Sequence, residues 1–163
     1  MEVRAGTRDD LDAIQLVALR GCTDAIGALV PDDVVVAEAS RRYSMAALCE
    51  HILARQLLVG VDTAERLEVV CMVDERDDHA ALTTVLAPQH PARDVSGVSM
   101  LEALRSEGWS GALVSDCVLG NLAHERFHES AGFSPGDVEA IEFAGFEIYR
   151  RWWWIGPDDG HDR

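Results

Sequence analysis

The chain has 163 residues, 48% of them hydrophobic, and a formal net charge of −15. This length suits a single domain with a real core. The acidic charge argues against a nucleic-acid-binding protein, which needs a basic face to displace counterions, and against binding to an anionic membrane surface. No apolar run approaches the roughly 20 residues that span a bilayer, and the N-terminus lacks the apolar segment of a secretory signal. We therefore expect a cytoplasmic protein.

The N-terminal third predicts one strand followed by two helices. Residues 1–6 alternate weakly, as a short strand does. Thr7 offers a hydroxyl N-cap to a helix whose apolar residues recur at helical spacing and which ends at Gly27. A second helix is expected from about residue 36 to 55, because the apolar side chains between positions 45 and 52 form one stripe.

The middle of the chain predicts an antiparallel meander. Three β-rich segments, 56–61, 67–73 and 80–87, are separated by polar turns, and Pro88 stops the third. The C-terminal part then alternates again between helix and strand. Its expected elements are a loop at 88–96, a helix at 97–107 ended by Gly108, a strand at 112–118, a helix from the N-cap Asn121 to Ala131, and two strands at 138–143 and 146–155.

The order of these elements sets the fold class. A strand–helix–strand crossover pairs its strands in parallel, whereas the hairpins pair antiparallel. The sequence therefore predicts an α/β fold with a mixed, mostly antiparallel central sheet and helices on both faces. We expect one domain over residues 1–155 and a loose tail over 156–163. The four cysteines lack the spacing of a zinc site, so no metal is expected.

One segment resembles a known family. Residues 121–133 read N-L-A-H-E-R-F-H-E-S-A-G-F, which is similar to the N-x-x-A-x-x-F-Y-x-x-x-G-F segment of the GNAT superfamily of acyl-CoA-dependent N-acyltransferases. The opening at 3–14 and the strand at 82–88 fit the same family, so that the resemblance covers about residues 2–155. It implies the acyl-CoA N-acyltransferase fold and transfer of an acetyl group from acetyl-CoA to an amine on a small molecule or a protein.

The resemblance also implies where acetyl-CoA, the co-substrate, would bind. The backbone of Val85 and Leu86 would pair with its pantetheine arm, and Asn121 would both cap its helix and bond that arm. Its pyrophosphate would bind main-chain amides at a helix N-terminus. The residues expected there are Arg93, Asp94, Val95, Ser96, Gly97, Val98 and Ser99. In neither of two registers does this segment fit the family pattern R/Q-x-x-G-x-G/A fully, and an ordinary strand-to-helix loop is the alternative.

The catalytic acid implied by the resemblance is His128, because the family places a tyrosine at that position. An imidazolium can donate a proton near neutral pH, whereas a histidine with no role is the alternative. No general base can be chosen among Glu68, Asp74, Glu75 and His79. The irregular loop and the missing tyrosine favour a second hypothesis, in which a catalytically weak GNAT-fold domain senses a ligand or binds a protein.

Two features bear on partners. The acidic net charge would draw in cationic substrates such as amines, although it also serves solubility alone. The run Arg150-Arg151-Trp152-Trp153-Trp154 cannot place all three indoles on one side of a strand, because side chains alternate. An exposed tryptophan there would favour a homodimer or line the acceptor site, whereas packing under a helix is the alternative.

Overall fold

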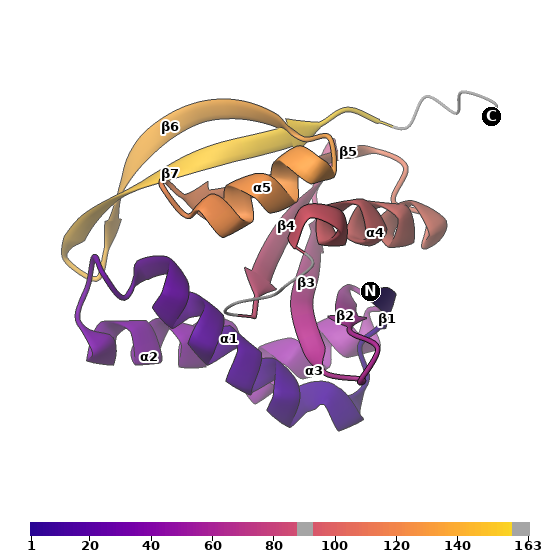
Figure 1. Cartoon of the computed structure of the whole chain (residues 1–163), viewed down its shortest axis with the longest axis horizontal. Helices are drawn as coiled ribbons and strands as arrows, with labels where there is room; N and C mark the ends of the chain where they lie inside the picture. Colours follow the sequence, from indigo (N-terminus) through magenta and orange to yellow (C-terminus); the bar gives the residue numbers. More distant parts are fainter. Residues whose placement is uncertain (88–92, 158–163) are drawn as a thin grey trace.

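The structure, a computed structural model, describes residues 1–87 and 93–157 (Figure 1). Within them seven strands form one sheet, in the order β1-β2-β3-β4-β5-β7-β6. Only β4 and β5 run parallel, so the predicted mixed, mostly antiparallel sheet is confirmed. The strands are β1 Glu2–Ala5, β2 Leu57–Val61, β3 Leu67–Glu75, β4 His79–Leu86, β5 Ala112–Val118, β6 Ser134–Phe143 and β7 Phe146–Ile155.

Helices cover both faces of the sheet, as predicted (Figure 1). On one face α4 and α5 pack over a core that includes Met100, Phe127 and Trp153. On the other face α1 and α3 pack over a core that includes Ile14 and Leu48. The helices are α1 Leu11–Ile26, α2 Asp32–Arg42, α3 Met45–Leu53, α4 Arg93–Ser106 and α5 Leu122–Ser130. None of them, in the part of the chain that the structure describes, is long and apolar enough to cross a membrane.

The single helix predicted over residues 36–55 is wrong, because α2 and α3 are separate helices. The break falls at Tyr43, whose backbone leaves the helical region with φ −106° and ψ 37°. Ser44 then starts α3, and its Oγ accepts a hydrogen bond from the Ala47 amide at 3.3 Å. The hydroxyl of Ser44, a good N-cap, was the available signal. The break turns Tyr43 inward, where it is 3% exposed.

Two further predicted boundaries are corrected. β6 begins at Ser134, and a shift in its pairing with β7 lies between Pro135 and Val138. α4 begins at Arg93, so that Gly97 lies inside the helix. A Cβ atom at Gly97 would overlap the carbonyl oxygen of Phe127. Glycine at this position therefore permits the close crossing of α4 and α5, which is a packing reason for a residue first singled out as part of a loop.

The two parallel strands separate halfway along their length. β4 and β5 pair only between His79–Leu82 and Ala112–Ser115. At the end of this pairing the Ser115 hydroxyl donates a hydrogen bond to the Leu82 carbonyl oxygen at 3.2 Å. Beyond it, β4 continues beside β3 and β5 continues beside β7. The result is a wedge-shaped gap in the sheet, which we call the splay.

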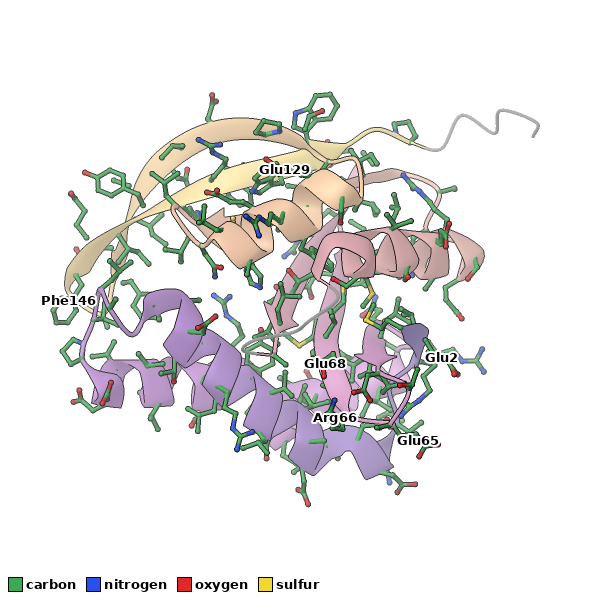
Figure 2. All side chains as sticks on the ribbon, viewed as in Figure 1. Glu2, Glu65, Arg66, Glu68, Glu129 and Phe146 are labelled. Carbon is green, nitrogen blue, oxygen red and sulfur yellow. The ribbon has the colours of Figure 1, made fainter. Side chains whose placement is uncertain are left out.

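The long β6–β7 hairpin arches past the splay towards the N-terminal helices (Figure 1). Figure 2 shows Phe146 at the tip of this hairpin, beside the connection between α1 and α2. Ile148 of β7 packs there against Ile26 and Val35. The hairpin and the helices α1 and α2 thus form walls on either side of the splay.

Candidate active site at the splay

A pocket of about 120 Å³ occupies the splay. Cys22 and Tyr43 line it on the side of α1 and α2, and Cys117 and His124 line it on the side of α5. It therefore lies in the plane of the sheet, in contact with helices of both layers. β4, β5 and the β6–β7 hairpin complete its walls.

The edge of β4 along the splay has open backbone groups. The Ala87 amide donates to the Glu68 carbonyl oxygen at 2.7 Å, so the backbone of Ala87 faces β3. Because successive residues of a strand point their backbone groups to opposite sides, Val85 also faces β3, whereas Thr84 and Leu86 face the splay. Of the two residues predicted to pair with pantetheine, the structure thus places Leu86 at the open edge and Val85 at the closed one. Thr84 joins Leu86, and sequence reasoning missed it.

Thr84 also carries an open side chain. Thr84 is only 9% exposed, and its Oγ1 atom is buried with no hydrogen-bond partner among the described residues. A buried hydroxyl without a partner is costly, so it is uncommon unless a ligand or water completes it. Thr83-Thr84, a polar pair within an otherwise apolar strand, was the sequence signal.

The predicted phosphate-binding segment is largely helical. Arg93, Asp94, Val95, Ser96, Gly97, Val98 and Ser99 all belong to α4. In a helix that starts at Arg93, the amides beyond the first turn donate to carbonyl oxygens one turn earlier, and among the described residues only those of Arg93, Asp94 and Val95 come too early in the helix for such a bond. Phosphate binding therefore remains a prediction, with the start of α4 as its site, and residues 88–92 of the predicted loop lie outside the described residues.

α5 begins as predicted. Asn121 is its N-cap, and its side-chain oxygen accepts from the His124 amide at 3.3 Å. The bond from Asn121 to pantetheine stays a prediction. His124 occupies the alanine position of the family pattern and His128 occupies its tyrosine position, so that the segment departs from that pattern at two positions.

His128 is fully buried, at 0% exposed. Its ring stacks on Trp153, with centroids 5.2 Å apart and planes 9° apart. Nδ1 lies 2.7 Å from the carbonyl oxygen of His124, which only accepts, so Nδ1 holds the ring proton. Burial lowers the pKa of His128 to about 4, against a smaller opposing effect of this bond. The neutral ring thus has no proton on Nε2, which has no partner among the described residues.

The acid role of His128 consequently stays a prediction, and it requires a proton that this state of the ring lacks. His124 lies on the same helix face and lines the pocket. Across residues 1–87 and 93–157, no three His, Cys, Asp or Glu side chains lie close enough to hold a metal ion.

The three tryptophans alternate as expected. Trp153 is 1% exposed under α5, and its Nε1 donates to the Cys117 sulfur at 3.2 Å. Trp154 is 53% exposed, and the ring of Trp152 lies 4.3 Å from the guanidinium carbon of Arg150. Packing under a helix therefore accounts for one of the three, and the homodimer stays a prediction.

The charged groups of the pocket were not those considered from the sequence. They are Glu38 and Arg42 of α2, Asp116 of β5 and Arg150 of β7. By contrast, Glu75 and His79 line a separate depression at the opposite end of β4. Asp74 pairs with His51, whose Nε2 is 3.3 Å from its Oδ1. Glu68, labelled in Figure 2, lies near the start of β3 beside the end of β4, where its carbonyl oxygen accepts from the Ala87 amide, and it is not among the residues that line the pocket.

Comparison with known proteins identifies the fold. No protein-family model and no curated protein matches the sequence. The structure is similar to PaiA N-acetyltransferase from Thermoplasma acidophilum, solved with coenzyme A, at 18% identity and a TM-score of 0.69, covering 91% of this chain and 96% of the other. It is similar to a GNAT-family acetyltransferase from Bacillus cereus, at 16% identity and a TM-score of 0.67, covering 96% of each chain.

A third similar structure is YncA, a putative acetyltransferase from Salmonella typhimurium solved with acetyl-CoA. It is 17% identical with a TM-score of 0.67, covering 100% of this chain and 96% of the other. The chain therefore has the fold of the GNAT acetyltransferases, in which the central sheet and its covering helices are shared.

Proposed function

We propose that the protein is an acetyltransferase that moves an acetyl group from acetyl-CoA to an amine. The observation that carries this proposal is the splay, where the backbone of Thr84 and Leu86 and the buried Thr84 hydroxyl are open together. Buried backbone groups are almost always paired. The two amides of a pantetheine arm, which is an extended chain, could pair with this edge as an added strand does.

Two features fit the rest of the co-substrate. α4 is a 14-residue helix that begins at Arg93, after β4 has ended at Leu86. The amides of Arg93, Asp94 and Val95, which come too early in the helix for an intrahelical bond, and the helix dipole favour a pyrophosphate. The fold is the one on which similar structures hold coenzyme A or acetyl-CoA.

The acceptor would enter from the other side of the sheet. The pocket continues between α1, α2 and the β6–β7 hairpin, away from α4. An amine there would attack the thioester through the splay, and the net charge of −15 would favour cationic acceptors, whether small molecules or protein amines. A cytoplasmic location fits this co-substrate and remains part of the proposal.

A second candidate function is a domain that binds a ligand without efficient catalysis. Two observations favour it. His128 is neutral and has no proton on Nε2, and Gly97 serves the packing of α4 on α5. Such a domain would bind acetyl-CoA, or its acceptor, and report the binding to a partner.

Calorimetry with acetyl-CoA tests the proposal. We expect binding, and stabilisation of the fold by about 2.7 kcal/mol at 100 times the dissociation constant. Thr84→Val removes the open hydroxyl at constant shape and should weaken binding about tenfold. Thr63→Val, on the exposed turn before β3, is the matched control and should bind as the wild type does.

Release of coenzyme A in the presence of amines then separates the two functions. Binding with acetyl transfer supports the enzyme, and binding without transfer to any amine supports the sensing domain. If millimolar acetyl-CoA neither binds nor stabilises the fold, the acetyltransferase proposal is wrong.

A further inference from the structure

Two oppositely charged side chains of the pocket, Arg42 and Asp116, have no hydrogen bonds within the described residues. The Arg42 guanidinium approaches one carboxylate, with its Nη2 3.3 Å from Glu38 Oε1 in a geometry that is an ion pair only. The Asp116 carboxylate approaches one guanidinium, with its Oδ2 3.6 Å from Arg150 Nη1. Both side chains line the pocket, Arg42 from the last turn of α2 and Asp116 from β5.

The nearest partners of these two charges are already engaged elsewhere. Glu38 is held by Arg41, whose Nε and Nη2 donate to its two oxygens at 2.8 and 2.7 Å. Arg150 is held by Glu139, which accepts from its Nε at 2.6 Å, and by the ring of Trp152. Arg41 and Glu139 therefore neutralise the two inner partners. Arg42 and Asp116 are left with most of their donor and acceptor capacity unused.

Arg42 and Asp116 do not neutralise each other, because among the described ion pairs none joins them. Both nevertheless act on Tyr43, which lines the same pocket. Burial raises the pKa of the Tyr43 phenol, Arg42 lowers it, and Asp116 raises it. The open space of the pocket thus has a positive wall on α2 and a negative wall on β5.

The other end of the pocket is apolar. Ile26, Ile141, Phe143 and Ile148 line it where the β6–β7 hairpin meets α1. A ligand that matches all three surfaces carries a cation, an anion and an apolar group within a few bonds of one another.

We propose that the acceptor is a small zwitterion, a free α-amino acid with an apolar side chain, whose ammonium binds Asp116 and whose carboxylate binds Arg42. The proposal rests on the acetyltransferase function and narrows its acceptor. Asp116 is the first residue of β5 beyond its pairing with β4, so a nitrogen held there faces the splay. The carboxylate at Arg42 then orients the amino acid, and the side chain fills the apolar end.

The same placement makes Asp116 the group that takes the proton. The ammonium gives one proton to Asp116, and the amine nitrogen attacks the thioester carbonyl carbon. The N–C bond forms, the C–S bond breaks, and the electron pair of that bond leaves with sulfur. The nitrogen loses a second proton, so that the products are the N-acetylamino acid, coenzyme A as a thiol and one proton released to water.

Three probes that differ by one charged group test the proposal. Leucine has both charges, 3-methylbutylamine lacks the carboxylate, and 4-methylpentanoate lacks the amine. Binding is measured by calorimetry with and without coenzyme A, and acetyl transfer by thiol release. We expect leucine to bind and react at least about tenfold better than 3-methylbutylamine, since one charge-assisted pair is lost.

Variants assign each charge to its side chain. Arg42→Gln should remove the preference for leucine over 3-methylbutylamine, and Arg42→Lys should restore part of it. Asp116→Asn should weaken both amines about equally and leave 4-methylpentanoate unaffected. Arg20→Gln, an exposed arginine of α1 beside the pocket wall, is the control and should change no affinity.

The outcomes separate this inference from the function on which it rests. Equal affinities of wild type for leucine and 3-methylbutylamine, or a preference unchanged by Arg42→Gln, would overturn it. A lysine peptide acetylated in preference to every amino acid would also overturn it, although the acetyltransferase function would stand. Leucine that binds through Arg42 without any consumption of acetyl-CoA would support the zwitterion-binding site, but it would refute both the acetyltransferase function and the acceptor role of the amino acid.

Discussion

The two halves of the β4–β5 pair differ in how their polar groups are used. In the paired half the strands bond to each other, and even the Ser115 hydroxyl donates to the Leu82 carbonyl oxygen. In the splayed half the backbone groups of Thr84 and Leu86 face away from β3 and lie beyond the pairing with β5. The Thr84 hydroxyl and the Asp116 carboxylate there lack hydrogen bonds within the described residues. Because buried polar groups are usually paired, the unpaired groups of the splayed half are where we propose that a ligand binds.

The layer between α5 and the sheet is also fully packed, and the largest effect that we predict is a dependence of its stability on pH. Trp153, which pairs with Ser115, stacks on the neutral ring of His128. The pKa of His128 is about 4 in the fold and 6.5 in the unfolded chain, so the unfolded state takes up the proton first. This contribution to stability is fully present above pH 6.5 and is lost as the pH falls towards 4, by about 3 kcal/mol.

Urea denaturation between pH 7 and pH 4 measures this loss. His128→Phe keeps an aromatic ring on Trp153 and should remove that part of the pH dependence, whereas His79→Gln, at the surface beside Asp78, should keep it. An equal loss in the wild type and in His128→Phe would contradict the assignment. The same variant tests the predicted acid, because an unchanged rate of acetyl transfer at pH 7 rules that role out.

α1 approaches β4 closely at Gly21, which lines the pocket in the splay. A Cβ atom at Gly21 would overlap the Val85 side chain and lie 2.6 Å from the Leu86 carbonyl oxygen. Although alanine favours a helix over glycine by about 1 kcal/mol, overpacking costs more. We expect Gly21→Ala to lower the free energy of unfolding by about 1–2 kcal/mol and to weaken acetyl-CoA binding.

Gly111→Ala is the matched control for this substitution, because a Cβ atom there meets nothing within 4 Å. It should change stability by less than about 0.5 kcal/mol. If Gly21→Ala is as stable as the control, α1 can shift without cost, and the close approach does not set the splay.

The smallest predicted effect compares one substitution in each half of the β4–β5 pair, and the free energy of unfolding should change in opposite directions. Ser115→Ala removes a donor from a satisfied pair and should destabilise the fold by about 1 kcal/mol. Thr84→Val replaces an open buried hydroxyl with a methyl group and should stabilise it by a similar amount. Thermal denaturation of both variants decides this, and a loss of stability in Thr84→Val would mean that its hydroxyl is satisfied in the folded protein.

The fold could be predicted from the sequence because its signals are local. Apolar periodicity, Asn121 as an N-cap and Gly108 as a stop each depend on a few neighbouring residues. The prediction failed where a local signal was overlooked, as at Ser44 between α2 and α3. The predicted helix start at Gly97 was also wrong, because α4 begins at Arg93 and glycine at position 97 is explained by the nearby carbonyl oxygen of Phe127 on α5.

The candidate site was less predictable for the same reason. Asn121 was found as a helix cap. Thr84 was missed although the polar pair Thr83-Thr84 marks it within an apolar strand, whereas Arg42 and Asp116 were missed because nothing near them in the chain marks them. Val85 and Leu86 were proposed together, and only the pairing with β3 shows that their backbones face opposite sides. The surroundings of His128, which set its charge, come from α5 and β7 together.

The sequence by itself determined the order of helices and strands, the mixed sheet and the resemblance to the GNAT acyltransferases, since periodicity and short motifs are properties of neighbouring residues. Only the tertiary structure decided which polar groups stay open. Hydrogen bonding and burial depend on partners from distant segments. Here the divergence of β4 from β5 leaves the Thr84 hydroxyl without a partner among the described residues, whereas the packing of α5 on β7 buries His128 against Trp153.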